Sequence, residues 1–152
     1  MALAAATVIN AVAAIVEAAT GYDDRTDKGF PADKARLPDF GVEAGDEPIE
    51  TQTIHPGALE QHDLEVLVTV RVAAAEGLNA ARDAATAAVL TALHSPSTEA
   101  AVKALGVHTW HTTNISRARQ QAGEADLARV LISLRAVFFV SPAAPHLIVG
   151  AV

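Results

Sequence analysis

The chain has 152 residues, a formal net charge of −7 at pH 7 and no cysteine. This length predicts one domain, spanning residues 1–152. The lack of cysteine excludes disulfide bonds, a thiolate nucleophile and a Cys-ligated metal site. Apolar residues make up 51% of the chain and charged residues 19%, which indicates a folded protein. Alanine is the commonest apolar residue and buries little area, so a subunit that gains stability in an oligomer fits this composition.

The acidic residues are concentrated in one part of the chain. Residues 17–65 hold thirteen acidic against four basic residues, a balance of −9, whereas the rest hold five against seven, a balance of +2. An acidic half argues against a phosphate-binding surface, which needs clustered Lys and Arg. Two interpretations stay open: a solvated loop region, or an acidic surface that faces a specific partner, such as a DNA passage that must not hold its cargo.

The N-terminal stretch is uncharged and alanine-rich, but it does not fit a signal peptide. The first basic residue is Arg25, whereas a signal peptide begins with a basic region, and the stretch is too short to span a bilayer. We therefore expect a protein of the cytoplasm, with no membrane segment and an amphipathic helix over residues 2–20. The spacing predicts one buried helix face, and Gly21 fits the position after a helix end; the predicted face consists of Val8, Val12, Ile15, Val16 and Ala19.

Two polar stretches are predicted as loops, residues 21–36 and residues 45–61, and a short strand over 37–44 lies between them. The second loop has Ile49 and Ile54 as isolated apolar points. It fits either a hairpin arm or a flexible loop.

Residues 63–73 carry the clearest strand signal, because apolar and polar residues alternate with a period of two. A helix is predicted over 78–94, with alanines on the face that packs. Ser97 is the predicted N-cap of a further short helix that ends at Gly106.

Two long strands are predicted over 107–119 and 127–140, with a hairpin tip at 120–125 and a loose C-terminal tail at 141–152. This element order predicts an α+β domain with an antiparallel or mixed sheet of about four strands and two main helices packed on one face.

No residue cluster reaches the standard of a catalytic or metal site. His108 and His111 are three apart, but in a strand we expect them on opposite faces. His55 and His62 flank the acidic loop and are close enough in sequence to meet a carboxylate there. A weak cation site at Asp23, Asp24 and Asp27 lacks the pattern of a calcium loop. We therefore predict no catalytic residue, no metal and no cofactor.

Charged residues near the hairpin tip are the candidate interface. We expect Arg117 and Arg119 to face Glu124 and Asp126 across the hairpin, either as ordinary cross-strand pairs or as a tip that engages a neighbouring subunit. The acidic region supplies further candidate residues for a subunit or tail-tube interface, namely Glu43, Asp46, Glu47 and Glu50.

The order and periodicity of these elements resemble the phage tail terminator and tail-completion family, a group of lambda-like minor tail proteins. The likeness runs from residue 4 to about residue 140. It is carried by the leading amphipathic helix, by LPDFGVEA after a polar loop, by HDLEVLVTVRVAAAEGLNAARDAATAAVLTAL, and by the closing pair VHTWHTTNISRARQ and GEADLARVLISLRAVFFV. Few aromatic residues in 63–73 and an apolar C-terminal tail depart from the family pattern.

The resemblance implies a structural virion protein without catalytic residues or cofactor. It implies a homohexameric ring at the head-proximal end of the tail of a phage or gene-transfer-agent-like particle, assembled in the bacterial cytoplasm. Such a ring caps the tail tube, stops its polymerisation and provides the face on which the head docks. The implied partners are further copies of the chain, the tail tube protein and a head connector or neck protein, while DNA passes through the lumen without specific binding.

Two alternatives remain open at this point. One is another head–tail neck or joining protein on the same scaffold. The other is a small metal-dependent enzyme or ligand-binding domain that uses the histidines or the acidic loop.

Overall fold

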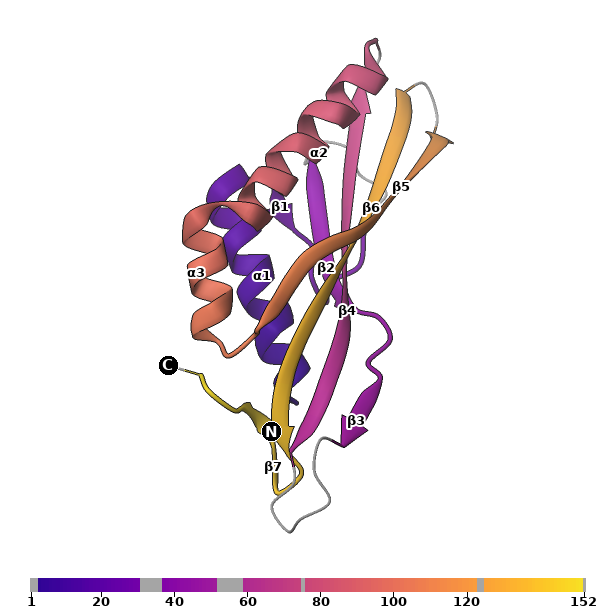
Figure 1. The fold of residues 1–152 in the computed structure, drawn as a ribbon. Helices are drawn as coiled ribbons and strands as arrows, with labels where there is room; N and C mark the ends of the chain where they lie inside the picture. Colours follow the sequence, from indigo (N-terminus) through magenta and orange to yellow (C-terminus); the bar gives the residue numbers. More distant parts are fainter. Residues whose placement is uncertain (1–2, 31–36, 52–58, 75, 123–124, 152) are drawn as a thin grey trace.

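The computed structural model describes residues 3–30, 37–51, 59–74, 76–122 and 125–151. Within these ranges, α1 (Ala4–Thr20), α2 (Leu78–His94) and α3 (Pro96–Ala104) lie on one face of a curled sheet (Figure 1). The α+β class and the placement of the helices on one face are confirmed.

The sheet is mixed and has the strand order β1-β2-β4-β6-β5, with β3 also paired to β4 and β7 also paired to β6. All pairs are antiparallel except β1 with β2. The bounds are β1 (Asp23–Asp24), β2 (Asp39–Ala44), β3 (Ile49–Thr51), β4 (Glu60–Ala74), β5 (Thr109–Ala122), β6 (Ala125–Ser141) and β7 (Ala144–Ile148).

The expected number of about four strands is too low, because each side of the central β4–β6 pair is occupied by two strands in succession. On one side β2 and β3 follow each other along β4. The segment between them stays bonded, since the Gly45 amide donates to the Glu65 carbonyl and the Asp63 amide donates to the Pro48 carbonyl. On the other side β5 and β7 follow each other along β6.

The predicted loops and tail therefore contain short strands. Residues 21–36 include β1, residues 45–61 include β3 and the start of β4, and residues 141–152 include β7. The hairpin-arm interpretation of 45–51 is the correct one, whereas Ile54 and His55 lie outside the described residues. The tail is not loose, because Ile148 is buried and the Val149 amide donates to the Phe139 carbonyl.

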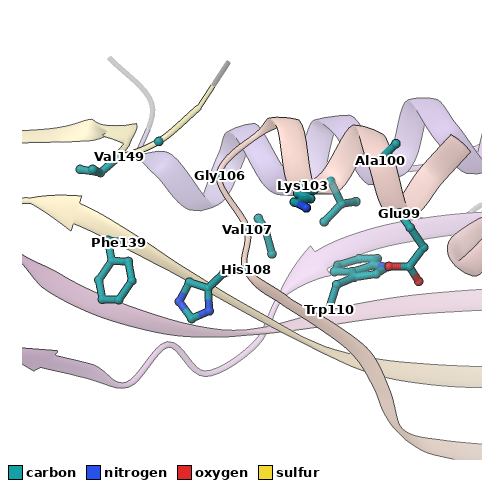
Figure 2. A pocket seen from close by; sticks show the side chains of 11 residues that line it. Glu99, Ala100, Lys103, Gly106, Val107, His108, Trp110, Phe139 and Val149 are labelled. Carbon is teal, nitrogen blue, oxygen red and sulfur yellow. The ribbon is translucent and has the colours of Figure 1, made fainter. Parts of the chain in front are cut away.

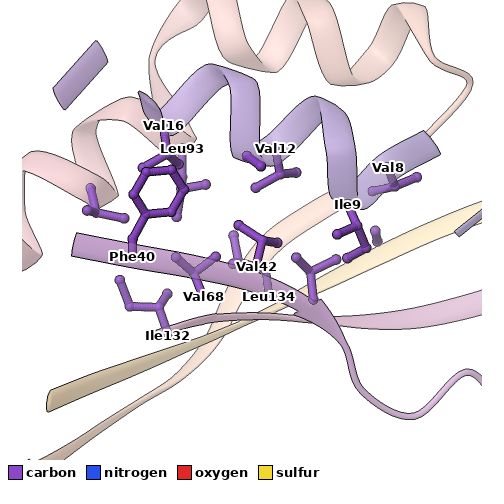
Figure 3. Packing of buried hydrophobic residues seen from close by; sticks show 14 of the residues in the cluster. Val8, Ile9, Val12, Val16, Phe40, Val42, Val68, Leu93, Ile132 and Leu134 are labelled. Carbon is purple, nitrogen blue, oxygen red and sulfur yellow. The ribbon is translucent and has the colours of Figure 1, made fainter. Parts of the chain in front are cut away.

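The core lies between the helices and the β4–β6 ladder. The predicted alternation in both long strands is confirmed, since their core-facing side chains are buried: Leu64, Val66, Val68, Val70, Val72, Ala128, Val130, Ile132, Leu134, Ala136, Phe138 and Val140. Figure 3 shows α1 over this layer, with its apolar side chains directed at β2, β4 and β6.

The buried face of α1 differs in part from the predicted one. Val8, Val12 and Val16 are buried as expected, but Ile15 is only half-buried and Ala19 is exposed. The packed face is instead extended by Ala5, Ile9 and Ala13. The helix contacts β2, α2 and β7 together, so its apolar stripe is turned toward all three elements.

The N-cap of α3 is Ser95 and not Ser97. Its hydroxyl oxygen accepts a hydrogen bond from the Thr98 amide at 3.2 Å. Pro96 takes the first helical position, where its missing N–H costs nothing, so the residue directly before the proline is the cap.

A buried ion pair lies on the sheet face that the helices do not cover. The guanidinium of Arg71 makes a two-point contact with the carboxylate of Asp39, on the neighbouring strand, with Nε to Oδ1 at 2.9 Å. Phe30 covers the pair, since the Arg71 guanidinium lies 4.6 Å from the centre of its ring. Phe30 thus covers charges that the helices leave open.

We predict that breaking this pair costs more stability than replacing it. Asp39→Asn removes the buried negative charge that pairs with Arg71 and should lower the free energy of unfolding by about 3–5 kcal/mol. The double variant Asp39→Leu/Arg71→Met removes both charges and should lose much less. Urea unfolding followed by circular dichroism measures the loss of stability in both variants. Asp83→Asn, on the exposed face of α2, is the control. Equal losses in the single and double variants would contradict the prediction.

Candidate interaction surface

The four acidic candidate residues lie along one side of the sheet. Glu43 is exposed on β2; Asp46 and Glu50 are exposed, and Glu47 is half-buried, on the segment that continues this edge. We call residues 46–51 the acidic arm. The backbone bonds of Asp46 and Pro48 to β4, together with the pairing of β3, fix the arm against the sheet.

His62 holds the acidic arm through its side chain as well. Its Nδ1 lies 3.0 Å from a carboxylate oxygen of Glu47, and its Nε2 lies 3.3 Å from a carboxylate oxygen of Glu60. The ring stacks on Phe138 with centroids 5.5 Å apart. The expected contact of His62 with a carboxylate is confirmed, and His62 joins the arm to the core. His55 lies outside the described residues.

The basic candidates lie on the opposite side of the sheet, on β5. Arg117 and Arg119 are both exposed, and the residues directly opposite them on β6 are Val130 and Ala128. Pairing continues up to Ala122 and Ala125, which puts Asp126 opposite Gln121. Neither arginine is therefore directly opposite Asp126 in the hairpin, and their side-chain pairing with Glu124 and Asp126 stays a prediction. Glu124 and the side chain of Asp126 lie outside what the structure describes.

The two neighbouring histidines are placed by different contacts. His108 precedes β5, so strand alternation does not set its direction, and its ring stacks on Phe139 with centroids 5.0 Å apart. His111 is exposed and lies opposite Arg135. Because Phe139 and Arg135 share one face of β6, the expected placement of the histidines on opposite faces is wrong.

The aspartates after α1 shape a turn. The Asp24 carboxylate accepts a hydrogen bond from the Thr26 amide at 2.8 Å, and Asp23 lies 3.8 Å from the Arg25 guanidinium. The Thr26 hydroxyl in turn accepts a hydrogen bond from the Val42 amide, so the segment after β1 stays bonded to the edge of β2. Across the described ranges no group of three His, Asp or Glu side chains is arranged to hold a metal ion.

An ion pair that the sequence did not reveal lies on the open face of the sheet. Arg135 contacts Asp63 through Nε at 2.8 Å and through Nη2 at 2.8 Å. The hydrogen bond from Arg135 lowers the pKa of Asp63 below its ordinary value of 3.8; partial burial opposes this, and the charges of Arg135 and His111 add to it. The pair lines a hollow of about 460 Å³ together with Asp46, Glu65 and Asn114. The registers of β4 and β5 with β6, together with the bond from the Glu65 amide to the Asp46 carbonyl, bring these residues together, and the sequence shows none of them.

A second hollow was also not predicted, and we call it the α3 groove. It has a volume of about 750 Å³ and lies between α3, the start of β5 and the C-terminal segment (Figure 2). Trp110 forms part of its wall and is held by a hydrogen bond from its indole Nε1 to the Leu93 carbonyl at 3.0 Å. The groove is lined by Glu99, Ala100, Val102, Lys103, Gly106, Val107, His108, Trp110, Phe139, Val149 and Gly150.

Comparison with solved structures finds a structural likeness for this chain, whereas the two sequence comparisons find none. No family model matches the sequence, and no curated protein matches it. Among solved structures, this chain is similar to one chain of a structure described as the virion of a native gene transfer agent particle. The identity is 19% and the TM-score 0.49, over 88% of this chain and 97% of that chain. None of the described helices is long and apolar enough to cross a membrane.

The pKa of Asp63 leads to a pH prediction. Because this pKa is lower in the folded chain than in the unfolded chain, the pair stabilises the fold above pH 3.8 and the effect is lost as the pH falls through the lowered value. We expect Asp63→Asn to lower the unfolding midpoint in urea at neutral pH, and the difference from wild type to shrink in acid. Arg135→Gln is the matched control, because it removes the partner of Asp63. In a chain that carries Arg135→Gln, adding Asp63→Asn should change the unfolding midpoint little. A difference that persists or grows in acid would contradict this account.

Proposed function

We propose that this chain is a structural subunit of a phage-like particle, and specifically a tail terminator that assembles into a ring and caps the tail tube. The observation that carries the proposal is the pair of different lateral edges on one rigid sheet. One edge bears the acidic arm, and the other is β5, a strand of 14 residues with β6 on one side and no described strand on the other.

The two edges suit repeated association of identical copies. An edge strand presents unpaired backbone N–H and C=O groups, so it is a template for contact with another chain. Two different patches on one subunit give a head-to-tail interface, which closes into a ring when the rotation between copies divides a full turn. The acidic residues along one side of the sheet and the basic residues Arg117 and Arg119 on the other give such an interface charge complementarity.

The element order supports the choice of a tail terminator. The features on which the family resemblance rests are the leading helix, the strand after a polar loop, the long strand followed by a helix, and the closing strand pair. They correspond to α1, β2, β4 with α2, and β5 with β6. In this proposal the ring contacts the tail tube protein and a head connector or neck protein, and DNA passes through its lumen.

Charge reversal on β5 tests the ring. The double variant Arg117→Glu/Arg119→Glu should raise the concentration at which rings form at least about tenfold, about 1.4 kcal/mol, because it brings like charges together across the interface. Light scattering on a sizing column and negative-stain images measure the assembly. The control variant Lys28→Glu/Arg82→Glu makes the same change in net charge away from β5. Identical assembly curves for wild type and the β5 variant would contradict the ring interface.

Co-assembly with tube protein tests the cap. Tail tube protein that polymerises in the presence of this chain should give shorter tubes that carry one ring at one end. Binding to the head connector without binding to tubes would instead identify a neck or joining protein. Tubes of unchanged length with no bound chain would contradict the terminator function.

A further inference from the structure

We propose that the acidic arm of one copy docks in the α3 groove of the next copy, with Ile49 against the apolar wall and Glu50 against Lys103. This inference rests on the proposed ring and names the two surfaces that build it. It concerns a contact between copies, because within one copy the arm and the groove lie on opposite sides of the β4–β6 pair (Figure 1).

The arm and the groove lie at the same level of the sheet. Ile49 is opposite His62 on β4, and His62 is opposite Phe138 on β6. Two residues that line the groove are bonded to β6 next to Phe138, on its side away from β4. The Val149 amide donates to the Phe139 carbonyl, and the His108 amide donates to the Val137 carbonyl. A neighbour that places its arm in this groove is therefore shifted little along the strands. In the proposed ring such a neighbour is rotated about an axis along the strands, and a repeat with little rise along that axis closes instead of extending into a filament.

The arm presents an apolar side chain in a fixed position. Ile49 is 56% exposed, although it sits on a strand that is paired to β4. The contact between Glu47 and His62 and the bond from the Asp63 amide to the Pro48 carbonyl hold the backbone before Ile49, and the pairing of β3 with β4 holds the backbone after it. Little conformational entropy is then lost when the arm binds, which favours association.

The groove offers apolar surface at the place where the ladder on β6 is interrupted. β5 begins at Thr109, opposite Val137, and β7 ends at Ile148, opposite Val140, so the groove opens beside Phe139. Trp110, Val102 and Val107 contribute its apolar lining, and Val149 is 42% exposed on its rim. A volume of about 750 Å³ holds a short segment of chain and not only one side chain.

Charge selects the arm of a second copy as the occupant. The arm carries Asp46, Glu47 and Glu50, while the groove carries Lys103. The remaining carboxylate of the groove, Glu99, is engaged by His94 at 3.1 Å. Within the described ranges no hydrogen bond or ion pair engages the side chain of Glu50 or of Lys103, so each side chain can form a charged hydrogen bond to the other.

Cysteine cross-linking tests the contact directly, because the chain has no cysteine of its own. In Ile49→Cys/Ala100→Cys both positions are exposed, and Ala100 lines the groove. We expect a short bifunctional maleimide to give a ladder of covalent oligomers on a denaturing gel, up to the ring. Ile49→Cys/Ala84→Cys is the matched control, with its second cysteine on the exposed surface of α2, and it should stay largely monomeric.

Each result of this experiment decides the matter. Rings in solution without cross-linked oligomers on the gel would overturn the docking while leaving the proposed function standing. The absence of rings and of cross-linked oligomers would overturn the docking and the proposed ring. Equal ladders in the two cysteine pairs, or dimers from Ile49→Cys alone, would overturn the docking, because they indicate random contact or a symmetric arm-to-arm interface.

Substitution of Ile49 tests the chemistry of the docking. Ile49→Asp should raise the ring-forming concentration at least tenfold with unchanged circular dichroism, and Ile49→Leu should restore assembly to within about threefold of wild type. Rings that form normally with Ile49→Asp but lose binding to tube protein would overturn the inference, because the occupant of the groove would then be that partner.

Discussion

The antiparallel ladder between β4 and β6 is the constraint on which the rest of the structure depends. It joins every residue of β4 from Glu60 to Ala74 to a partner on β6. Because side chains alternate along both strands, this one register sets which residues face the helices and which face outward. A shift of β4 by one residue relative to β6 would turn Val66 and Val68 away from the helix-covered face and would bring Asp63 to that face.

The same ladder explains why the two lateral edges are discontinuous and different. The central strands are longer than their neighbours, so each side is filled in two steps, by β2 and β3 along β4 and by β5 and β7 along β6. One discontinuity carries the acidic arm, and the other opens the α3 groove beside Phe139. A pair of unlike features at one level of a sheet is what head-to-tail association of identical copies needs.

Sequence periodicity predicted the elements that depend on local chemistry. The bounds of α2, the alternation in β4 and β6, and the buried Val8, Val12 and Val16 follow from spacing alone. The short strands β1, β3 and β7 could not be predicted, because two to five residues carry no periodic signal and are ordered by the long strands beside them. Ser95 could have been identified as a cap, since Pro96 follows it. The α3 groove and the Asp63–Arg135 pair depend on tertiary register, which no local pattern encodes.

Hydrogen exchange at low and high protein concentration tests most directly whether this fold associates through its two lateral edges. Backbone amides in β5 and in residues 46–51 should gain protection as the chain assembles, while those on the exposed face of α2 should not change. Assembly that protects α2 and leaves both edges unchanged would contradict the account.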